Sequence, residues 1–211
     1  MKQTLIVTGG SININWFQNW LKEKNFDYII AVDKGLEALD LLKIGPNYII
    51  GDFDSINKTV LDKYKYNIIT LNKEKDFTDT HMALKLAIKL KSNEITIIGG
   101  TGTRIDHTLA NIHILKEALD SNIKCSIINE NNKIFLIDKP ADIKKDTYYK
   151  YISLIPLTTT VESITLDGCK YLLKNATLKI GESIGISNEQ LEEKTKIDFK
   201  AGILIAIYSK D

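Results

Sequence analysis

The sequence predicts an α/β domain, with a doubly wound and mostly parallel sheet, followed by a small all-β sandwich domain. In the first two thirds of the chain, short apolar runs alternate with amphipathic segments of helical period. Continuous apolar runs are typical of parallel strands that helices cover on both faces. From about residue 149 onward there is no convincing amphipathic helix, and short runs between turn residues favour an antiparallel sandwich.

The first predicted domain spans residues 1–140. We expect strands at residues 5–7, 28–32, 48–50, 67–70, 94–98, 123–128 and 133–137. We expect helices at residues 15–24, 36–43, 58–64, 79–90 and 107–119, the second of them stopped by Gly45 and Pro46. Several of these strands end in glycine or aspartate. Because ligands of doubly wound sheets bind at the carboxyl ends of the strands, these ends are where we expect a site.

The second predicted domain spans residues 141–211. We expect strands at residues 151–156, 161–166, 176–180, 183–187, 196–199 and 203–209. A domain of this length is near the minimum for independent folding. We therefore expect it to pack on the first domain or on a partner chain.

Composition excludes several classes of protein. The 211 residues are 44% hydrophobic and 26% charged, as in ordinary globular proteins, and the formal net charge of +1 predicts no nucleic-acid or membrane partner. Cys125 and Cys169 lack metal-ligand spacing, so we expect free thiols in a reducing compartment. The N-terminal apolar run is too short for a signal peptide, and no run approaches the ~20 residues of a membrane span. These features predict a cytoplasmic protein.

Two carboxylates follow the apolar run at residues 48–50. Asp52 and Asp54 are one residue apart, so in an extended segment their side chains point to the same side. Like charges held that close require a cation. Hard oxygen ligands at the mouth of an α/β sheet suit Mg²⁺ carrying a polyphosphate.

Further polar groups precede the helices expected at 79–90 and 107–119. Thr78 suits an N-cap and Asp79 a first helical turn, and the same carboxylate could hold a metal on a phosphate. Asp33 could bind ribose, bind metal or simply form a turn. Residues 99–107, GGTGTRIDH, form a glycine-rich connection whose free N–H groups could face an anion, with Arg104 binding phosphate oxygens. Asp106 could equally be a helix cap.

Taken together, these residues resemble thiamine pyrophosphokinases. The resemblance rests on residues 31–35 (AVDKG), 51–55 (GDFDS), 75–80 (KDFTDT), 99–107 (GGTGTRIDH) and 185–189 (GISNE), in this order along nearly the whole chain. It implies an α/β catalytic domain and a β-sandwich domain that binds thiamine. It also implies a homodimer, with the active site between the α/β domain of one subunit and the β domain of the other.

The resemblance also implies roles for individual residues. It gives Asp33, Asp52, Asp54 and Asp79 as Mg²⁺ ligands. It gives Asp33, Lys34, Gly35, Thr78, Gly100, Thr101 and Arg104 as binding the nucleotide. It gives Asp106, Tyr171, Ser187 and Asn188 as contacting thiamine, with Tyr171 where eukaryotic members carry a Trp. The catalytic candidates are Asp54, Asp79, Asp106 and Arg104.

The implied reaction transfers the whole pyrophosphoryl group of ATP to the thiamine hydroxyl, giving thiamine diphosphate and AMP. Clamped Mg²⁺ would neutralise the charge that develops on the phosphate oxygens. Either Asp79 or Asp106 could orient or deprotonate the hydroxyl. The rival interpretations are a phosphatase or sugar-nucleotide transferase with an Asp-x-Asp pair, and a non-catalytic nucleotide or thiamine sensor.

Overall fold

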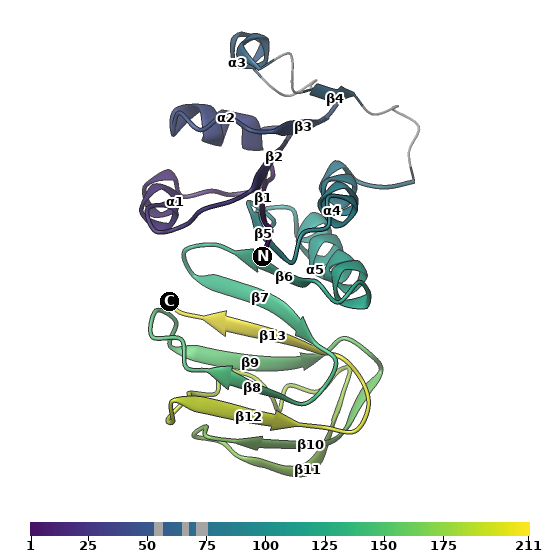
Figure 1. Cartoon of the computed structure of the whole chain (residues 1–211). Helices are drawn as coiled ribbons and strands as arrows, with labels where there is room; N and C mark the ends of the chain where they lie inside the picture. The colour runs from purple at the N-terminus through teal and green to yellow at the C-terminus, as the bar shows by residue number, and fades with distance from the viewer. Residues whose placement is uncertain (53–56, 65–67, 71–75) are drawn as a thin grey trace. The chain divides into compact units, whose positions relative to one another are not determined.

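The computed structural model describes residues 1–52, 57–64, 68–70 and 76–211, and of 68–70 only the backbone (Figure 1). The chain divides into two compact units, Met1–Glu130 and Asn131–Asp211. None of the helices in the described ranges combines the length and the apolar character that a membrane span requires.

A parallel sheet forms the centre of the first unit. Its strands are β1 (Gln3–Val7), β2 (Tyr28–Val32), β3 (Tyr48–Gly51), β4 (Ile68–Thr70), β5 (Glu94–Ile98) and β6 (Lys124–Ile128). They lie in the order β4-β3-β2-β1-β5-β6, and each neighbouring pair is parallel. The central strands carry continuous apolar runs, so Leu5, Ile6, Ile30 and Ile97 are fully buried.

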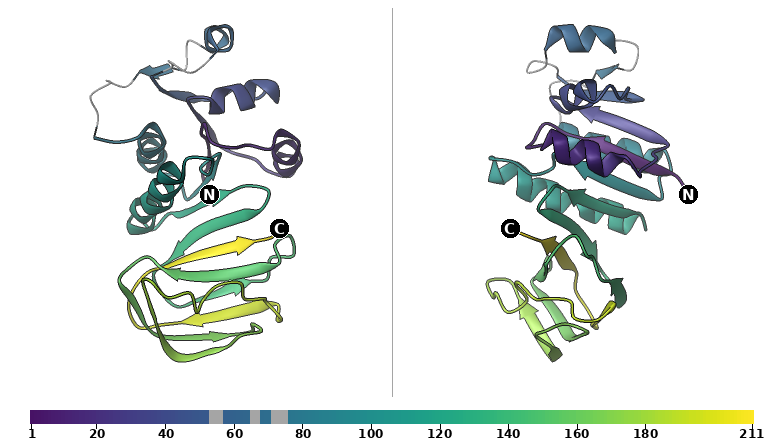
Figure 2. Two further views of the ribbon diagram at one scale, coloured as in Figure 1. Left: turned by 180° about the vertical axis from the view of Figure 1, so that it is seen from behind. Right: turned by 90° about the vertical axis from the view of Figure 1, so that its left-hand side faces the viewer.

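Helices cover both faces of this sheet. They are α1 (Ile14–Leu21), α2 (Gly35–Leu41), α3 (Lys58–Lys63), α4 (Asp79–Lys89) and α5 (Ile105–Asp120). Figures 1 and 2 show α1 and α2 on one side of the central strands and α4 and α5 on the other. The predicted doubly wound α/β architecture is therefore confirmed.

The strand order reverses between β1 and β5. From β1 the chain builds outward through β2 and β3 to β4, and it then returns to place β5 on the other side of β1. The connections that leave β1 and β5 therefore diverge to opposite sides of the sheet. A crevice at such a reversal is the usual ligand site of an open α/β sheet.

The second unit is an antiparallel sandwich, as predicted. Strand β13 (Leu204–Ser209) pairs with β7 (Asn132–Ile137) and with β9 (Tyr151–Pro156). A second sheet has the order β11-β10-β12-β8, formed by β11 (Leu173–Lys179), β10 (Thr160–Asp167), β12 (Lys194–Asp198) and β8 (Ala141–Lys144). Apolar residues of both sheets share one buried cluster, which includes Leu154, Val161, Ile164, Ile197 and Leu204.

The structure differs from the predicted elements at several points. Helix α5 begins at Ile105 rather than at residue 107, and its N-cap is Arg104, so Asp106 lies in the first turn and is not the cap. Strand β8 was not predicted. The predicted boundary at 140/141 lies beyond the division at 130/131, because β7 pairs with β13 inside the second unit.

The strand predicted at residues 183–187 is wrong. Ser187 has a φ of 55°, which breaks an extended chain. The segment nevertheless lies along β9, since the N–H of Leu154 donates to the carbonyl of Gly185 at 2.8 Å. Asn188 forms an isolated bridge with Ile152. The apolar alternation in this segment thus belongs to a loop on the sheet and not to a strand.

Candidate active site

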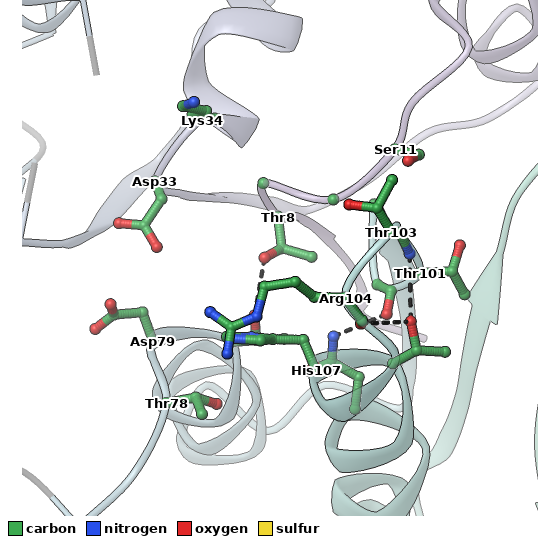
Figure 3. A pocket seen from close by; sticks show the side chains of 18 residues that line it. Thr8, Ser11, Asp33, Lys34, Thr78, Asp79, Thr101, Thr103, Arg104 and His107 are labelled. Carbon is green, nitrogen blue, oxygen red and sulfur yellow. Dashed lines mark hydrogen bonds between the residues drawn. The ribbon is translucent and has the colours of Figure 1, made fainter. Parts of the chain in front are cut away.

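A pocket of about 630 Å³ opens at the reversal point of the parallel sheet (Figure 3). Its walls come from the connections after β1, β2 and β5, from the first turn of α4 and from the first two turns of α5. The residues that line it are Thr8–Ser11, Asp33, Lys34, Thr78–Thr80, Gly99–Arg104, His107, Thr108 and Asn111. All of them belong to the first unit. The pocket therefore lies where the strand order predicts a ligand.

The connections after β1 and β5 hold each other in place. The N–H of Gly10 donates to the carbonyl of Gly99 at 3.0 Å, and the N–H of Ser11 donates to the carbonyl of Thr101 at 2.8 Å. A Cβ on Gly10 would lie 2.1 Å from the Gly99 oxygen, so only glycine fits there. The glycine-rich connection takes part in these two bonds through the carbonyls of Gly99 and Thr101 and not through their N–H groups. The side chains of Lys34 and Arg104 add positive charge to the pocket wall.

Asp33 enters the pocket from the end of β2. Its backbone has a φ of 47°, and its N–H donates to the carbonyl of Ile50 at 3.1 Å. The left-handed turn directs the partly buried carboxylate into the pocket, while Lys34 lines the wall beside it. Gly35 lies beneath this wall, where a Cβ would meet the carbonyl of Val7 at 1.9 Å. Gly35 thus allows α2 to start close to β1.

The first turn of α4 forms the facing wall. Thr78 is the N-cap, and its hydroxyl oxygen accepts the N–H of His81 at 3.2 Å. The hydroxyls of Thr80 and Thr8 are 2.8 Å apart, which ties the helix to the end of β1. In Figure 3 the carboxylate of Asp79 stands opposite that of Asp33. Two acidic side chains from separate elements therefore face one space.

Arg104 and Asp106 form an ion pair at the mouth of the pocket. Arg104 Nε donates to one oxygen of Asp106 at 3.2 Å, and Nη2 donates to the other. Both side chains are exposed, at 70% and 64% of their full area. The hydrogen bonds from Arg104 lower the pKa of the Asp106 carboxyl. Arg104 lines the pocket, and Asp106 reaches it only through Arg104.

The predicted acidic cluster is described in part. Asp33 and Asp79 line the pocket, Asp52 is an exposed residue just after β3, and Asp54 lies outside the described residues. Within the described ranges no three His, Cys, Asp or Glu side chains form a group that could hold a metal. The donors that are present, carboxylate oxygens, nevertheless suit Mg²⁺ in chemical type.

Comparison with known proteins decides between the rival interpretations. Residues 20–127 match the family model for thiamin pyrophosphokinase, catalytic domain, and residues 141–204 match the model for thiamin pyrophosphokinase, vitamin B1 binding domain. The chain is 36% identical over 215 aligned residues to thiamine pyrophosphokinase of Bacillus subtilis (strain 168), with 100% of both proteins covered. The chain belongs to the thiamine pyrophosphokinase family. The predicted family and enzyme class are therefore confirmed, and the phosphatase and sensor interpretations are dropped.

Further relatives and solved structures agree with this assignment. A thiamin pyrophosphokinase of Caenorhabditis elegans is 25% identical over 200 residues, covering 89% of this chain and 80% of that protein. The crystal structure of the Bacillus subtilis thiamine pyrophosphokinase matches with a TM-score of 0.89 at 34% identity and 100% coverage of both chains. That of Geobacillus thermodenitrificans thiamin pyrophosphokinase matches at 0.86 and 30%, covering 99% and 98%. The fold and both of its domains are those of thiamine pyrophosphokinases.

Of the four residues that the thiamine pyrophosphokinase resemblance gave for thiamine, Tyr171, Ser187 and Asn188 lie in the second unit, whereas Asp106 lies in the first. Asn188 is buried, and its amide oxygen accepts the N–H of Tyr171 at 2.9 Å while its amide nitrogen donates to the carbonyl of Tyr171 at 2.7 Å. Tyr171 itself is 61% exposed. The N–H of Ser187 donates to the hydroxyl of Ser153 at 2.9 Å. Asn188 thus bonds to the Tyr171 backbone, whereas the Tyr171 ring is largely exposed, with Lys170 Nζ 5.6 Å from its centroid.

Several pocket residues were not predicted from sequence. Thr8 and Thr80 form the hydroxyl pair described above, and Asn111 donates from its buried amide to the carbonyl of Gly100 at 2.8 Å. The sequence signal for Thr8 was its place at the end of a predicted strand, since strand ends are ligand sites in this architecture. The signal for Asn111 was its place one helical turn after His107, because residues four apart lie on the same face of a helix.

Proposed function

We propose that the pocket binds ATP as its Mg²⁺ complex and that the enzyme transfers the pyrophosphoryl group of ATP to the hydroxyl of thiamine. The products are then thiamine diphosphate and AMP. The observation that carries this proposal is the meeting of two cations, Lys34 and Arg104, with two carboxylates, Asp33 and Asp79, at the reversal point of a parallel sheet. The positive side chains suit phosphate oxygens, and the carboxylates suit a metal ion bound to those oxygens.

In this proposal the cationic side chains hold and orient the phosphates. Arg104 can bind two phosphate oxygens at once, and Lys34 can add a point charge from the facing connection. Thr78 and the glycine-rich wall at Gly100 and Thr101 shape the space for the nucleotide. The interlocked connections after β1 and β5 keep this wall fixed, so little reorganisation accompanies binding.

Asp33 and Asp79 would hold the Mg²⁺, and the sequence pattern adds Asp52 and Asp54 as further candidate ligands. When bound, Mg²⁺ neutralises charge on the phosphate oxygens. Asp79 is also the candidate to accept the proton of the thiamine hydroxyl, because it lines the pocket directly. The first turn of α4 fixes the direction in which the Asp79 carboxylate points.

Thiamine is proposed to bind at Tyr171, Ser187 and Asn188 of the second unit. The exposed ring of Tyr171 can stack on a flat cationic ring. By the family resemblance, the enzyme is proposed to be a cytoplasmic homodimer in which the α/β domain of one subunit and the β domain of the other complete each active site. No nucleic-acid or membrane partner is proposed.

The test is the adenine product formed when the protein is incubated with ATP, Mg²⁺ and thiamine, separated by chromatography. We expect AMP and thiamine diphosphate in equal amounts, and no product when a chelator removes Mg²⁺. ADP with thiamine monophosphate would retain the site but refute transfer of the pyrophosphoryl group. Undiminished turnover in the presence of the chelator would refute the metal assignment.

A further inference from the structure

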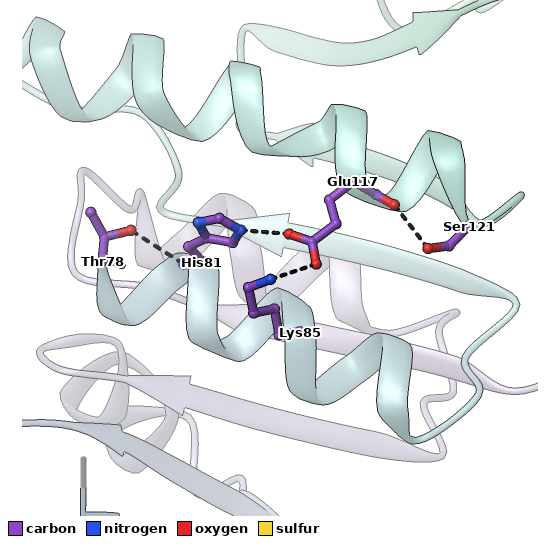
Figure 4. Close-up of polar contacts among 5 residues, drawn as sticks. All are labelled: Thr78, His81, Lys85, Glu117 and Ser121. Carbon is purple, nitrogen blue, oxygen red and sulfur yellow. Dashed lines mark hydrogen bonds and ion pairs between the residues drawn. The ribbon is translucent and has the colours of Figure 1, made fainter. Parts of the chain in front are cut away.

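A cluster of polar side chains joins α4 to α5 outside the pocket (Figure 4). Glu117 of α5 accepts a hydrogen bond from His81 Nε2 at 2.6 Å and another from Lys85 Nζ at 2.8 Å. Both donors come from successive turns of α4. The side chains are 19% (His81), 35% (Lys85) and 34% (Glu117) exposed, so the cluster is shielded in part from water. Partly buried ion pairs fix the relative position of two helices better than fully exposed ion pairs do.

His81 and Lys85 also contact Phe77, the residue before the α4 N-cap. The rings of Phe77 and His81 meet edge to face with centroids 4.7 Å apart. Lys85 Nζ lies 4.7 Å from the centroid of the Phe77 ring. Glu117 therefore orients two side chains that together fix where the chain enters the helix.

The turn between Phe77 and His81 carries Thr78 and Asp79 into the pocket. On the pocket side, the hydroxyl pair of Thr80 and Thr8 holds this turn. On the outer side, His81 holds it through Glu117 and through its own N–H, which the Thr78 hydroxyl accepts. In the described part of the chain, the pocket wall includes Thr78, Asp79 and Thr80 but none of His81, Lys85 and Glu117.

We propose that Glu117, acting through His81 and Lys85, is a positioning residue that sets Asp79 and Thr78 for the Mg²⁺-bound nucleotide. The inference rests on the proposed function, since it assigns these two residues to the nucleotide site. Glu117 touches no substrate. Its effect reaches the pocket through one helical turn, whose orientation decides whether the Asp79 carboxylate faces Asp33.

The test compares four variants in the full-length protein. Glu117→Gln keeps the shape of the side chain, but the amide has one oxygen in place of the two that accept hydrogen bonds from His81 and Lys85. His81→Phe keeps the ring against Phe77 but loses the hydrogen bond, whereas His81→Gln keeps a donor. Asp120→Asn is the matched control, because Asp120 pairs only along α5, with Lys116 at 2.7 Å among the described ion pairs.

Two binding readouts separate positioning from plain stability. Calorimetry gives the Kd of an unreactive ATP analogue with a methylene bridge between its α and β phosphorus atoms, in the presence of Mg²⁺. Steady-state kinetics give the KM for ATP and the KM for thiamine. We expect Glu117→Gln and His81→Phe to weaken analogue binding roughly three- to tenfold, which lies within the range for residues that act without contact to the ligand. The KM for ATP should rise in step, and the KM for thiamine should not change.

His81→Gln should recover most of the analogue affinity, and Asp120→Asn should match the wild type. If Glu117→Gln and His81→Phe lower the melting temperature but leave the analogue Kd within about twofold of the wild type, the cluster is only structural and the inference is wrong. Failure of the wild type to form AMP would refute the proposed function itself. Normal wild-type catalysis with unchanged analogue binding in the variants would refute only the positioning role.

Discussion

The Asp33 carboxylate lies directly against the backbone of Gly51, at the end of β3. A Cβ at position 51 would come within 2.2 Å of Asp33 Oδ1, so any side chain there must displace the carboxylate. We expect Gly51→Ala to lower kcat/KM for ATP by roughly 10- to 100-fold, because a misplacement of about 1 Å can cost that much. Steady-state kinetics with ATP as the varied substrate measure this.

The matched control is Gly45→Ala, since a Cβ on Gly45 meets no described atom within 4 Å. This variant should retain wild-type activity. Circular dichroism should show both variants folded. Wild-type kinetics in Gly51→Ala would mean that the position of the Asp33 carboxylate does not matter to the reaction.

Asp79 and Asp106 were equal candidates for the catalytic base on sequence alone, and their surroundings separate them. Arg104 occupies both carboxylate oxygens of Asp106 and lowers its pKa, and a lowered pKa makes a weaker base. We expect Asp79→Asn to reduce kcat by about 10²- to 10⁴-fold, and Asp106→Asn to reduce it by less than about tenfold. In Asp106→Asn the main change should be in the KM for ATP, because Arg104 loses the carboxylate that competes with phosphate.

Rapid-quench or steady-state kinetics on the two variants make the comparison. Equal losses of kcat would restore Asp106 as a candidate base. A KM for ATP that does not move in Asp106→Asn would show that its pairing with Arg104 is irrelevant to nucleotide binding.

At the scale of elements, the connection from β10 to β11, which contains Tyr171, is held by the side-chain amide of the buried residue Asn188. Asn188 bonds the N–H and the carbonyl of Tyr171, and its oxygen also accepts the N–H of Glu189 at 2.9 Å. Asn188→Ala removes these three partly buried hydrogen bonds, so we expect a loss of about 1–3 kcal/mol in the free energy of unfolding. Because the Tyr171 ring loses its fixed position, the KM for thiamine should rise severalfold while the KM for ATP stays the same.

Two variants of Tyr171 serve as comparisons for this prediction. Tyr171→Phe keeps the ring and should match the wild type, whereas Tyr171→Ala should raise the KM for thiamine as Asn188→Ala does. Denaturant unfolding and thiamine titration give both quantities. A normal KM for thiamine in Asn188→Ala would remove the link between the amide and the substrate.

The elements that could be predicted from sequence are those whose local pattern and tertiary burial agree. Strands β2 and β5 are continuous apolar runs bounded by turns, and their predicted limits match the structure. Segment 183–187 has the same alternation as a strand, but the left-handed backbone at Ser187 is set by packing against β9, which the sequence does not display. Strand β8 is short and only partly buried, so its pattern is weak.

The candidate site was predictable for a related reason. Asp33, Thr78, Asp79 and Arg104 all follow strands or open helices, positions that the α/β pattern brings to one edge of the sheet. What sequence could not supply is the pairing of side chains from distant segments. Three such pairings depend on distances that only the folded chain sets. They are the hydrogen bond between Thr8 and Thr80, the ion pair of His81 with Glu117, and the bonds between the connections that follow β1 and β5.

At the scale of the whole molecule, the two sets of proposed ligands lie in different units. The nucleotide residues belong to Met1–Glu130, and Tyr171, Ser187 and Asn188 belong to Asn131–Asp211. If each active site combines the first unit of one subunit with the second unit of its partner, defects in the two units are separable. A chain with a defective first unit can then supply an intact second unit to a chain with the opposite defect.

Complementation between two defective chains tests this arrangement. One chain carries Asp79→Asn, and the other carries Tyr171→Ala together with Asn188→Ala, each with its own affinity tag. When the two are co-expressed and mixed dimers are isolated through both tags, one of the two sites receives both intact units and the other receives neither. At a thiamine concentration well below the wild-type KM, we expect the mixed dimer to have about half of the wild-type activity and each parent homodimer to have much less than half. Mixed dimers that are no more active than the parent homodimers would mean that each chain builds its site alone. Failure to isolate any mixed species would refute the homodimer.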